Sequence, residues 1–297
     1  MLSIVQHNAF YADRIDFNAA RKLVAGAAAT SLADVHGVAL HVLAELGDRH
    51  SMFFTKDEYD RLSAKLGQAT TTPTSSTALV DGVGLLQLPP VEALMPSDRA
   101  TAYFTPARSA LASTNACGWI VDLRYDTGGS LPPMLEAVAP LLGPGTFVSY
   151  KYRDGHTDRF TINDDLHVQQ PDMAPPSSGP RSTANQDLAH VPVAVLTNDQ
   201  TASAAEGVAM AFVGRPRTTS FGEPTAGVPT GNDVFPMPDG SALILMVGIG
   251  VDRTGATHDR PIVPDTSTAA QNGQSDPTKD AADKWLREQP QCSSAGT

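Results

Sequence analysis

The sequence is poor in the residues that recognise nucleic acids, and it has no long apolar run. Its 297 residues include 21 lysines and arginines against 32 aspartates and glutamates, a net charge of −11, with no basic cluster. Because nucleic-acid binding depends on clustered lysine and arginine, we expect no nucleic-acid partner. The longest apolar stretch, Ala242–Val251, is far shorter than the roughly 20 residues of a membrane-spanning helix, so we predict a buried strand and no membrane span.

Cysteine is scarce as well. Cys117 and Cys292 predict neither a disulfide framework nor a metal-binding set, so no metal and no cofactor are expected. The segment Met1–Asn8 has neither a basic leader nor an apolar core, so no signal peptide is visible. We expect a cytoplasmic protein if the chain is complete and an exported one if a leader was removed. The oligomeric state stays open.

What the sequence does contain is a helical pattern followed by an α/β pattern. Residues 1–67 predict an N-terminal helical bundle, in which Leu32–Leu46 forms one helix that Gly47 ends. The threonine-rich stretch Gln68–Thr77 is predicted to be a linker. Residues 78–270 predict an α/β core, and residues 271–297 a C-terminal helix and tail.

Within the core, apolar strands alternate with alanine-rich helices, which indicates strands covered on both faces. The expected strands are 82–88, 119–123, 191–197 and 242–251; the expected helices are 100–113, 131–142, 203–213 and, at the C-terminus, 275–289. The segment Pro171–Leu188 is a long irregular excursion.

Three short segments carry candidate chemistry. Ser203 opens a helix after a strand, where helix amides favour developing negative charge, so it is a candidate nucleophile; the alternative is an ordinary N-cap. Gly128 and Gly129 follow another strand, where their amides can form an oxyanion hole or only a turn. His50 follows a helix end and is a candidate general base; the alternative is a surface histidine.

Together these segments resemble the tail-specific, or C-terminal processing, serine peptidase family. The similar motifs occur in the family's order and are Trp119–Gly129, Val195–Glu206, Gly222–Gly227 and Pro261–Asp265. The part ending in Leu46–Ser51 is similar to the branch that contains the tricorn core peptidase and the retinoid-binding protein of the photoreceptor matrix.

The resemblance implies a crotonase/ClpP-like α/β spiral core preceded by the small helical bundle, and a peptide or protein substrate. It implies Ser203 as the nucleophile of a serine endopeptidase that works through an acyl-enzyme. The amide of Ala204, with that of Gly128 or Gly129, would form the oxyanion hole.

Two departures from the family's pattern shape the prediction. Val228 stands where many members have a catalytic lysine, and no lysine lies between Lys151 and Lys279, so a Ser/Lys dyad in its family form is excluded. The tricorn-like branch uses a histidine instead, and His50 takes that position. The segment between His50 and Gly82 is too short for a PDZ insertion, so recognition of a substrate's C-terminal carboxylate is not implied.

The third group of the site is left open by the sequence. Asp259 is a candidate to orient His50, or else a solvated loop acid; His258 and Asp48 are lesser candidates. A non-catalytic relative that binds a hydrophobic ligand or peptide is the alternative function. An esterase with a Gly-x-Ser-x-Gly elbow and a metal hydrolase are disfavoured, because neither motif is present.

Overall fold

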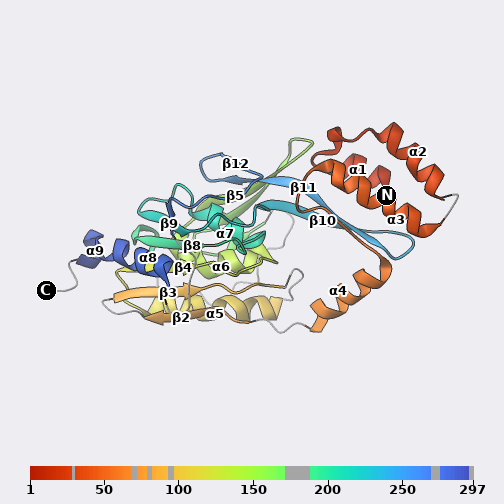
Figure 1. Cartoon of the computed structure of the whole chain (residues 1–297). Helices are drawn as coiled ribbons and strands as arrows, with labels where there is room; N and C mark the ends of the chain where they lie inside the picture. Colours follow the sequence, from red (N-terminus) through yellow and green to blue (C-terminus); the bar gives the residue numbers. More distant parts are fainter. Residues whose placement is uncertain are drawn as a thin grey trace. The chain divides into compact units, whose positions relative to one another are not determined.

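The structure is a computed structural model that describes residues 1–28, 31–68, 72–78, 82–92, 97–170, 188–268 and 275–293 (Figure 1). The chain divides into two compact units, neither continuous in sequence. The smaller unit comprises Met1–Ala69, Tyr150–Thr157 and Thr230–Ile249; the larger comprises Thr70–Ser149, Asp158–Pro229 and Gly250–Thr297.

The smaller unit holds the N-terminal helices and a long hairpin. Its helical elements are α1 (Leu2–Asn8), η1 (Ala12–Arg14), α2 (Phe17–Ala28), α3 (Leu32–Leu46) and α4 (Lys56–Gln68), and its short strand is β1 (Met52–Phe54). The prediction for α3 is confirmed in detail. Ser31 accepts the Asp34 N–H at the helix start, and Gly47 ends the helix in the left-handed conformation, with φ +67°.

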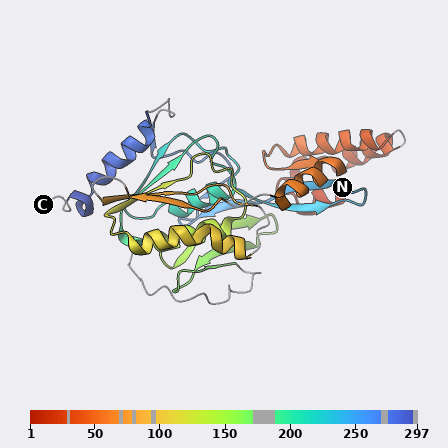
Figure 2. The same ribbon diagram turned by 90° about the horizontal axis from the view of Figure 1, so that it is seen from below.

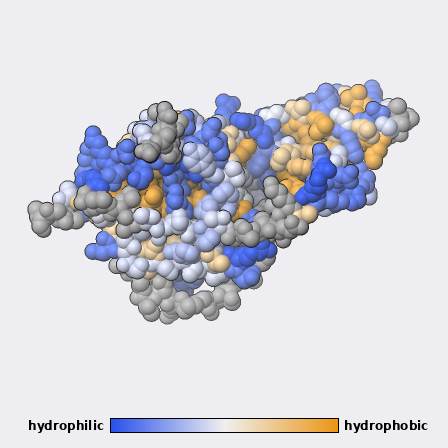
Figure 3. Space-filling model, turned by 60° about the horizontal axis from the view of Figure 1, so that its bottom comes forward, coloured by the Kyte–Doolittle hydropathy of each residue, from blue (hydrophilic) through white to orange (hydrophobic). Residues whose placement is uncertain are grey.

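The hairpin is formed by β10 (Thr230–Pro236) and β11 (Ala242–Asp252), which pair antiparallel. Leu243, Leu245 and Val247 of β11 are buried in the same core cluster as Val42 and Leu46 of α3. The smaller unit is therefore assembled from segments about 200 residues apart, in addition to the N-terminal helices expected from residues 1–67. Figure 3 shows hydrophobic residues on the surface of this unit, and Leu23, Leu32 and Leu40 of its helices are exposed.

The larger unit is built on a six-stranded sheet in the order β13-β9-β8-β4-β3-β2. The strands from β3 to β13 are parallel along this path, and β2 is an antiparallel edge strand. Their bounds are β2 Ser75–Ala78, β3 Val83–Gln87, β4 Gly118–Asp122, β8 Val193–Thr197, β9 Thr218–Gly222 and β13 Thr266–Ser267.

The helices of this unit are α5 (Ser97–Ser113), α6 (Leu131–Leu142), α7 (Ala204–Phe212), α8 (Pro277–Arg287) and α9 (Pro290–Ser293), with the short η3 (Leu188–His190) (Figures 1 and 2). Every residue of β4 and β8 is buried, which confirms the prediction of strands covered on both faces. On one face Ala282 and Leu286 of α8 pack against Val83, Ile120 and Ala194.

Strands that were not expected from the sequence include β5 (Gly145–Tyr152), β6 (Thr157–Ile162) and β7 (Val168–Gln169). The strands β1, β2, β9, β10 and β13 were not expected either. The linker prediction for Gln68–Thr77 is wrong at its end, because Ser75–Ala78 pairs with β3 as the edge strand β2. A two-residue pair, β12 (Thr257–His258) against β11, was missed as well. The expected excursion over residues 171–188 lies outside the described residues except for Leu188. Within the described part of the chain, no helix has the length and apolar character needed to cross a membrane.

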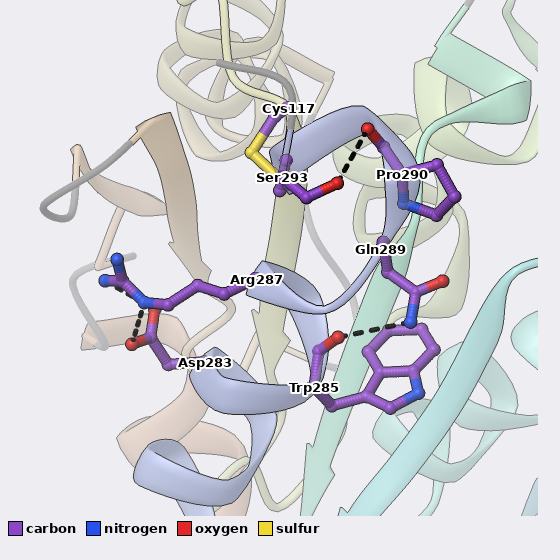
Figure 4. The surroundings of a disulfide bond; sticks show 8 residues. Cys117, Asp283, Trp285, Arg287, Gln289, Pro290 and Ser293 are labelled. Carbon is purple, nitrogen blue, oxygen red and sulfur yellow. Dashed lines mark hydrogen bonds and ion pairs between the residues drawn. A yellow bond between two sulfur atoms is a disulfide. The ribbon is translucent and has the colours of Figure 1, made fainter. Parts of the chain in front are cut away.

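The prediction that the cysteines form no disulfide is wrong. Cys117 and Cys292 are bonded, with their Cα atoms 4.9 Å apart and a sequence separation of 175 (Figure 4). Cys117 directly precedes β4, and α8 packs on β4 and β8 before the chain turns into α9. The tertiary packing of the last helices brings the sulfurs together, and two isolated cysteines have no spacing pattern that announces this.

Candidate active site

Ser203 sits at a sharp turn between β8 and the first residue of α7, as the N-cap of that helix. Its backbone has φ +53° and ψ −115°, a conformation that residues with a side chain rarely adopt. Such strain costs about 1–3 kcal/mol and persists only where the surroundings enforce it, which is common at functional sites. A strained serine on a strand-to-helix turn is also the arrangement of a nucleophile elbow, although the sequence motif differs.

The surroundings that enforce this turn centre on Glu206, three residues into α7. Its Oε2 accepts the Ser203 N–H and the Val228 N–H, both at 2.9 Å. Its Oε1 accepts the Thr225 hydroxyl and the Gly227 N–H. The fully buried carboxyl group therefore fastens the serine turn to the segment 225–228 with four hydrogen bonds. Burial raises the pKa of Glu206, and these four bonds oppose the rise.

Gly128 lies directly against the serine turn. A Cβ atom at Gly128 would be 2.6 Å from the Ala202 carbonyl oxygen, 2.8 Å from the Ala204 nitrogen and 2.9 Å from the Ser203 Cβ. Its φ of +90° also favours glycine. The structure thus brings Ser203, Ala204 and Gly128 together, as the predicted oxyanion hole requires.

The backbone amides of this loop are not equally available to a ligand. The Gly128 N–H donates to Asp126 Oδ1 at 2.9 Å. The Gly128 carbonyl accepts the Val91 N–H at 2.9 Å, so the peptide unit between Gly128 and Gly129 is held at its oxygen. Gly129 adopts φ +121°, and a Cβ there would lie 1.6 Å from the Val91 oxygen. Ala204 is the first residue of α7, where amides lack an intrahelical acceptor.

His50 belongs to the smaller unit, between α3 and β1, and is buried. Asp48 Oδ1 accepts the backbone N–H groups of His50 and Ser51 and fixes the turn. The ring Nδ1 is 2.8 Å from Thr230 Oγ1, and Nε2 is 2.8 Å from Asn232 Nδ2. With the proton on Nδ1, the ring donates to Thr230 and accepts the Asn232 amide N–H, which satisfies both contacts.

The protonation of His50 is shaped by opposing effects. Burial lowers its pKa, while the charge of Asp48 and the hydrogen bond with Thr230 raise it, and burial is the larger effect. The imidazole is therefore held in its neutral form, which is the form a general base needs.

The three candidates for the third group have different surroundings. Asp259 belongs to the larger unit, where its carboxylate is 3.9 Å from the guanidinium of Arg260 and 43% of its side chain is exposed. His258 Nε2 pairs with the buried carboxylate of Asp252 at 2.8 Å. Asp48 is in the smaller unit and contacts the His50 backbone. The ring nitrogens of His50 contact Thr230 and Asn232, which the sequence did not indicate.

Four residues at the site went unassigned in the sequence. Glu206 was visible as the fourth residue of a Ser-x-x-Glu capping box, a signal that predicts its contact with the Ser203 N–H. Asp126 precedes the glycine pair, but only the fold reveals its burial. Thr230 and Asn232 lie about 180 residues from His50, and no local pattern links them. Among the described residues, no group of three or more His, Cys, Asp or Glu could hold a metal ion.

Comparison with known families identifies the family of this chain. The model of peptidase family S41 matches residues 82–268, more than half of the chain. The chain belongs to peptidase family S41. This is a family of serine peptidases, whose substrates are peptides or proteins, and the match spans both the Gly128–Gly129 loop and the Ser203 turn.

Curated proteins similar to this chain include a nisin-resistance protein of Lactococcus lactis subsp. lactis, 30% identical over 192 residues that cover 64% of this chain and 56% of that protein. The chloroplastic carboxyl-terminal-processing peptidase 2 of Arabidopsis thaliana is 28% identical over 173 residues, 56% of this chain and 30% of the relative. The chain thus spans about half the length, or less, of these relatives.

Solved structures share the fold over most of the chain. A lipoprotein from Streptococcus agalactiae superposes with a TM-score of 0.75 at 26% identity, covering 96% of this chain and 93% of the other. The photosystem II D1 C-terminal processing protease gives a TM-score of 0.63 at 15% identity, covering 90% and 91%. The core is the crotonase/ClpP-like α/β core of family S41, as predicted.

Proposed function

We propose that this protein is a serine endopeptidase that hydrolyses peptide bonds through an acyl-enzyme on Ser203. The observation that carries the proposal is the strained Ser203 turn, held by Glu206 and packed against Gly128. A helix N-cap alone does not need positive φ, since N-cap residues usually have extended backbone. The strain is understandable if the turn exists to present the hydroxyl group to a substrate.

In this mechanism His50 is the general base and then the general acid. Its Nε2 removes the Ser203 proton as the hydroxyl oxygen attacks the scissile carbonyl, and the imidazolium returns that proton to the leaving amine. A water molecule then attacks the acyl-enzyme while His50 takes its proton, and His50 returns that proton to the Ser203 oxygen. The step requires Nε2 to come within about 3 Å of the serine oxygen in the reacting complex. Asn232 must release Nε2 when this occurs.

The oxyanion is held by backbone amides. The Gly128 N–H is bonded to Asp126, so we assign the donors to Ala204 and Gly129. Each such donor stabilises the transition state by about 2.7–4 kcal/mol. Val228, which gives its N–H to Glu206, supplies no basic group at the position of the family's lysine. This residue is why we favour Ser/His over Ser/Lys chemistry.

The third group has two candidates, Thr230 and Asp259. With the proton on Nδ1, Thr230 Oγ1 at 2.8 Å would accept it and orient the ring without adding charge. Asp259 would also stabilise the imidazolium electrostatically. Comparing Thr230→Val with Asp259→Asn separates them, because only the group that orients His50 lowers kcat while leaving KM little changed.

A fluorophosphonate probe, with peptide mapping of the labelled site, tests the proposed function directly. We expect labelling at Ser203, no labelling of Ser203→Ala, and a labelling rate that falls at least about 100-fold in His50→Ala. Ser113→Ala, which removes an exposed serine of α5, is the matched control and should label normally. Peptide hydrolysis should likewise be normal in Ser113→Ala, slow in His50→Ala and absent in Ser203→Ala. Absence of labelling at Ser203 in a folded protein would reject the proposal.

The alternative is a non-catalytic member of the family that binds a hydrophobic ligand. A cavity of about 410 Å³ in the larger unit favours it, since apolar residues such as Ala209, Phe212 and Ile262 contribute to its lining. Arg215, His258 and Asp265 also line this cavity, and a concave site that combines apolar walls with a few polar groups can hold a small ligand. This alternative would be supported if the protein binds a hydrophobic fluorophore saturably and its Ser203 is never labelled by the fluorophosphonate.

A further inference from the structure

Asp126 is a buried acid that the proposed mechanism does not use. It follows β4 in the Asp-Thr-Gly-Gly segment, and no part of it is exposed. Its Oδ1 accepts the Gly128 N–H at 2.9 Å, and its backbone carbonyl accepts the Ala202 N–H at 2.9 Å. One residue therefore joins the two backbone segments that would form the oxyanion hole, the glycine loop and the serine turn.

The other carboxyl oxygen of Asp126 is unusual. Oδ2 is buried and has no hydrogen-bond partner within the described part of the chain. An ionised carboxylate with one hydrogen bond in an apolar interior is far less stable than the neutral acid. Burial accordingly raises the pKa of Asp126 to about 8, although the Gly128 hydrogen bond opposes the rise.

One titratable side chain is coupled to Asp126. Tyr103 of α5 is buried, and its hydroxyl donates to the Pro89 carbonyl at 2.9 Å. Burial raises the pKa of Tyr103 well above its usual value, and the charge of Asp126 adds to the rise. Tyr103 therefore stays neutral over the range in which Asp126 titrates.

We propose that Asp126 is a positioning residue which, as the neutral acid, holds the Gly128–Gly129 backbone beside Ser203 and keeps negative charge away from the oxyanion hole. The inference rests on the proposed function. A neutral Asp126 accepts the Gly128 N–H without competing with a developing oxyanion. When it ionises, a full negative charge lies next to the glycine loop and opposes the charge that the transition state must place there.

The proposal predicts a basic limb in the pH profile. The rate of Ser203 labelling by a fluorophosphonate should fall as the pH rises through about 8, because the neutral form is lost. One pH unit above the midpoint, only about a tenth of Asp126 is neutral, so the rate should be about tenfold below its plateau.

Asparagine and alanine at this position separate positioning from charge. Asp126→Asn keeps an acceptor for the Gly128 N–H and cannot ionise, so it should label within about threefold of the wild-type rate at pH 7 and lack the basic limb. Asp126→Ala removes the acceptor and should label roughly 10- to 100-fold more slowly at every pH. Asp164→Asn, an exposed acid of the same unit, and Tyr103→Phe should both retain the wild-type limb.

Urea unfolding gives a readout that does not depend on activity. Because the folded-state pKa of Asp126 is raised, its contribution to stability is complete below pH 4 and is lost as the pH rises to about 8. The urea midpoint of the wild type, relative to Asp126→Asn, should therefore fall over that range and then level. If the difference in urea midpoint between the wild type and Asp126→Asn does not change with pH, the proposal that Asp126 is a neutral acid is wrong.

The outcomes distinguish this inference from the proposed function. Labelling at Ser203 that is unaffected by Asp126→Ala would overturn the positioning role while the peptidase proposal stands. Loss of the basic limb in Asp126→Asn, with the slow labelling of Asp126→Ala, would support it. If wild-type Ser203 never labels, the proposed function fails and the positioning role fails with it, whereas the urea experiment still tests the neutral acid.

Discussion

Glu206 accepts the Ser203 N–H and the Val228 N–H with the same carboxylate oxygen, each at 2.9 Å. The N-cap residue of α7 and Val228 are therefore both hydrogen-bonded to one oxygen atom. The side chain at position 228 can change without loss of this contact, because the contact uses only the backbone. The hydrogen bonds that hold the Ser203 turn thus do not depend on the side chain at position 228.

Replacing the buried carboxylate should be costly. Glu206→Gln turns one acceptor oxygen into an amide that faces N–H or O–H donors, so two of the four hydrogen bonds are lost. We expect the free energy of unfolding to fall by about 2–4 kcal/mol and Ser203 labelling to slow. Urea unfolding measures the first effect. Glu288→Gln, at an exposed glutamate after α8, is the control and should change little.

The neutral state of His50 predicts that kcat/KM falls on the acid side of its pH profile. Because burial lowers the pKa of His50, kcat/KM should be lost only as the pH falls below the usual 6.5 of histidine. The hydrogen bond with Thr230 raises that pKa, so Thr230→Val should move the limb to still lower pH. His156→Gln, which removes an exposed histidine, should leave it in place. A limb above 6.5 would contradict the buried neutral ring.

The same shift affects stability with a defined sign. The unfolded chain binds the proton of His50 more readily than the folded one, so stability should fall as the pH drops through 6.5. His50→Gln should flatten this part of the profile of urea midpoint against pH. A profile identical to that of the wild type would show that His50 is exposed to water.

The glycine loop offers a test of backbone packing. Gly129→Ala and Gly155→Ala both place a side chain at positive φ, +121° and +92°, which costs about 1–2 kcal/mol. Only at Gly129 does the new Cβ meet backbone, 1.6 Å from the Val91 oxygen, whereas Gly155 has nothing within 4 Å. We expect Gly129→Ala to destabilise the protein much more, measured by thermal unfolding, and to abolish labelling of Ser203. Equal effects would contradict the packing of this loop.

The disulfide should contribute to stability. Removing it in a Cys117→Ser, Cys292→Ser double variant should lower the free energy of unfolding by about 2–4 kcal/mol. Dithiothreitol should reproduce the loss in the wild type and have no effect on the double variant, which serves as the control. An identical urea midpoint for both proteins, with and without reductant, would show that the bond does not form.

Much of the larger unit was predictable because its signals are local. The helix Leu131–Leu142 was predicted at its observed ends, and β4, β8 and α7 were placed within two residues. Continuous apolar runs and alanine-rich segments are sufficient for buried parallel strands and their helices. The turn at Ser203 and the pair Gly128–Gly129 follow from that alternation, because such turns lie at the carboxyl ends of the strands.

The features that the sequence did not predict depend on long-range contacts. The strands β5, β6 and β7 mix polar and apolar residues and have no clear period, and β10 is recognisable only through its pairing with β11. The same holds for the partners of His50, which come from β10, and for the burial of Asp126. In each case the decisive neighbour is supplied by a distant segment.

The bond between Cys117 and Cys292 closes a covalent ring around most of the chain, since the sequence separation of the two cysteines is 175. Both the Ser203 turn and the β10–β11 hairpin lie inside that ring, whereas the segment before Cys117, which holds the helices from α1 to α5 and the strands from β1 to β3, lies outside it. An oxidised chain that unfolds therefore remains a loop with one long tail. On electrophoresis without reductant it should migrate faster than its reduced form, and refolding should begin from the smaller set of shapes that a loop can adopt.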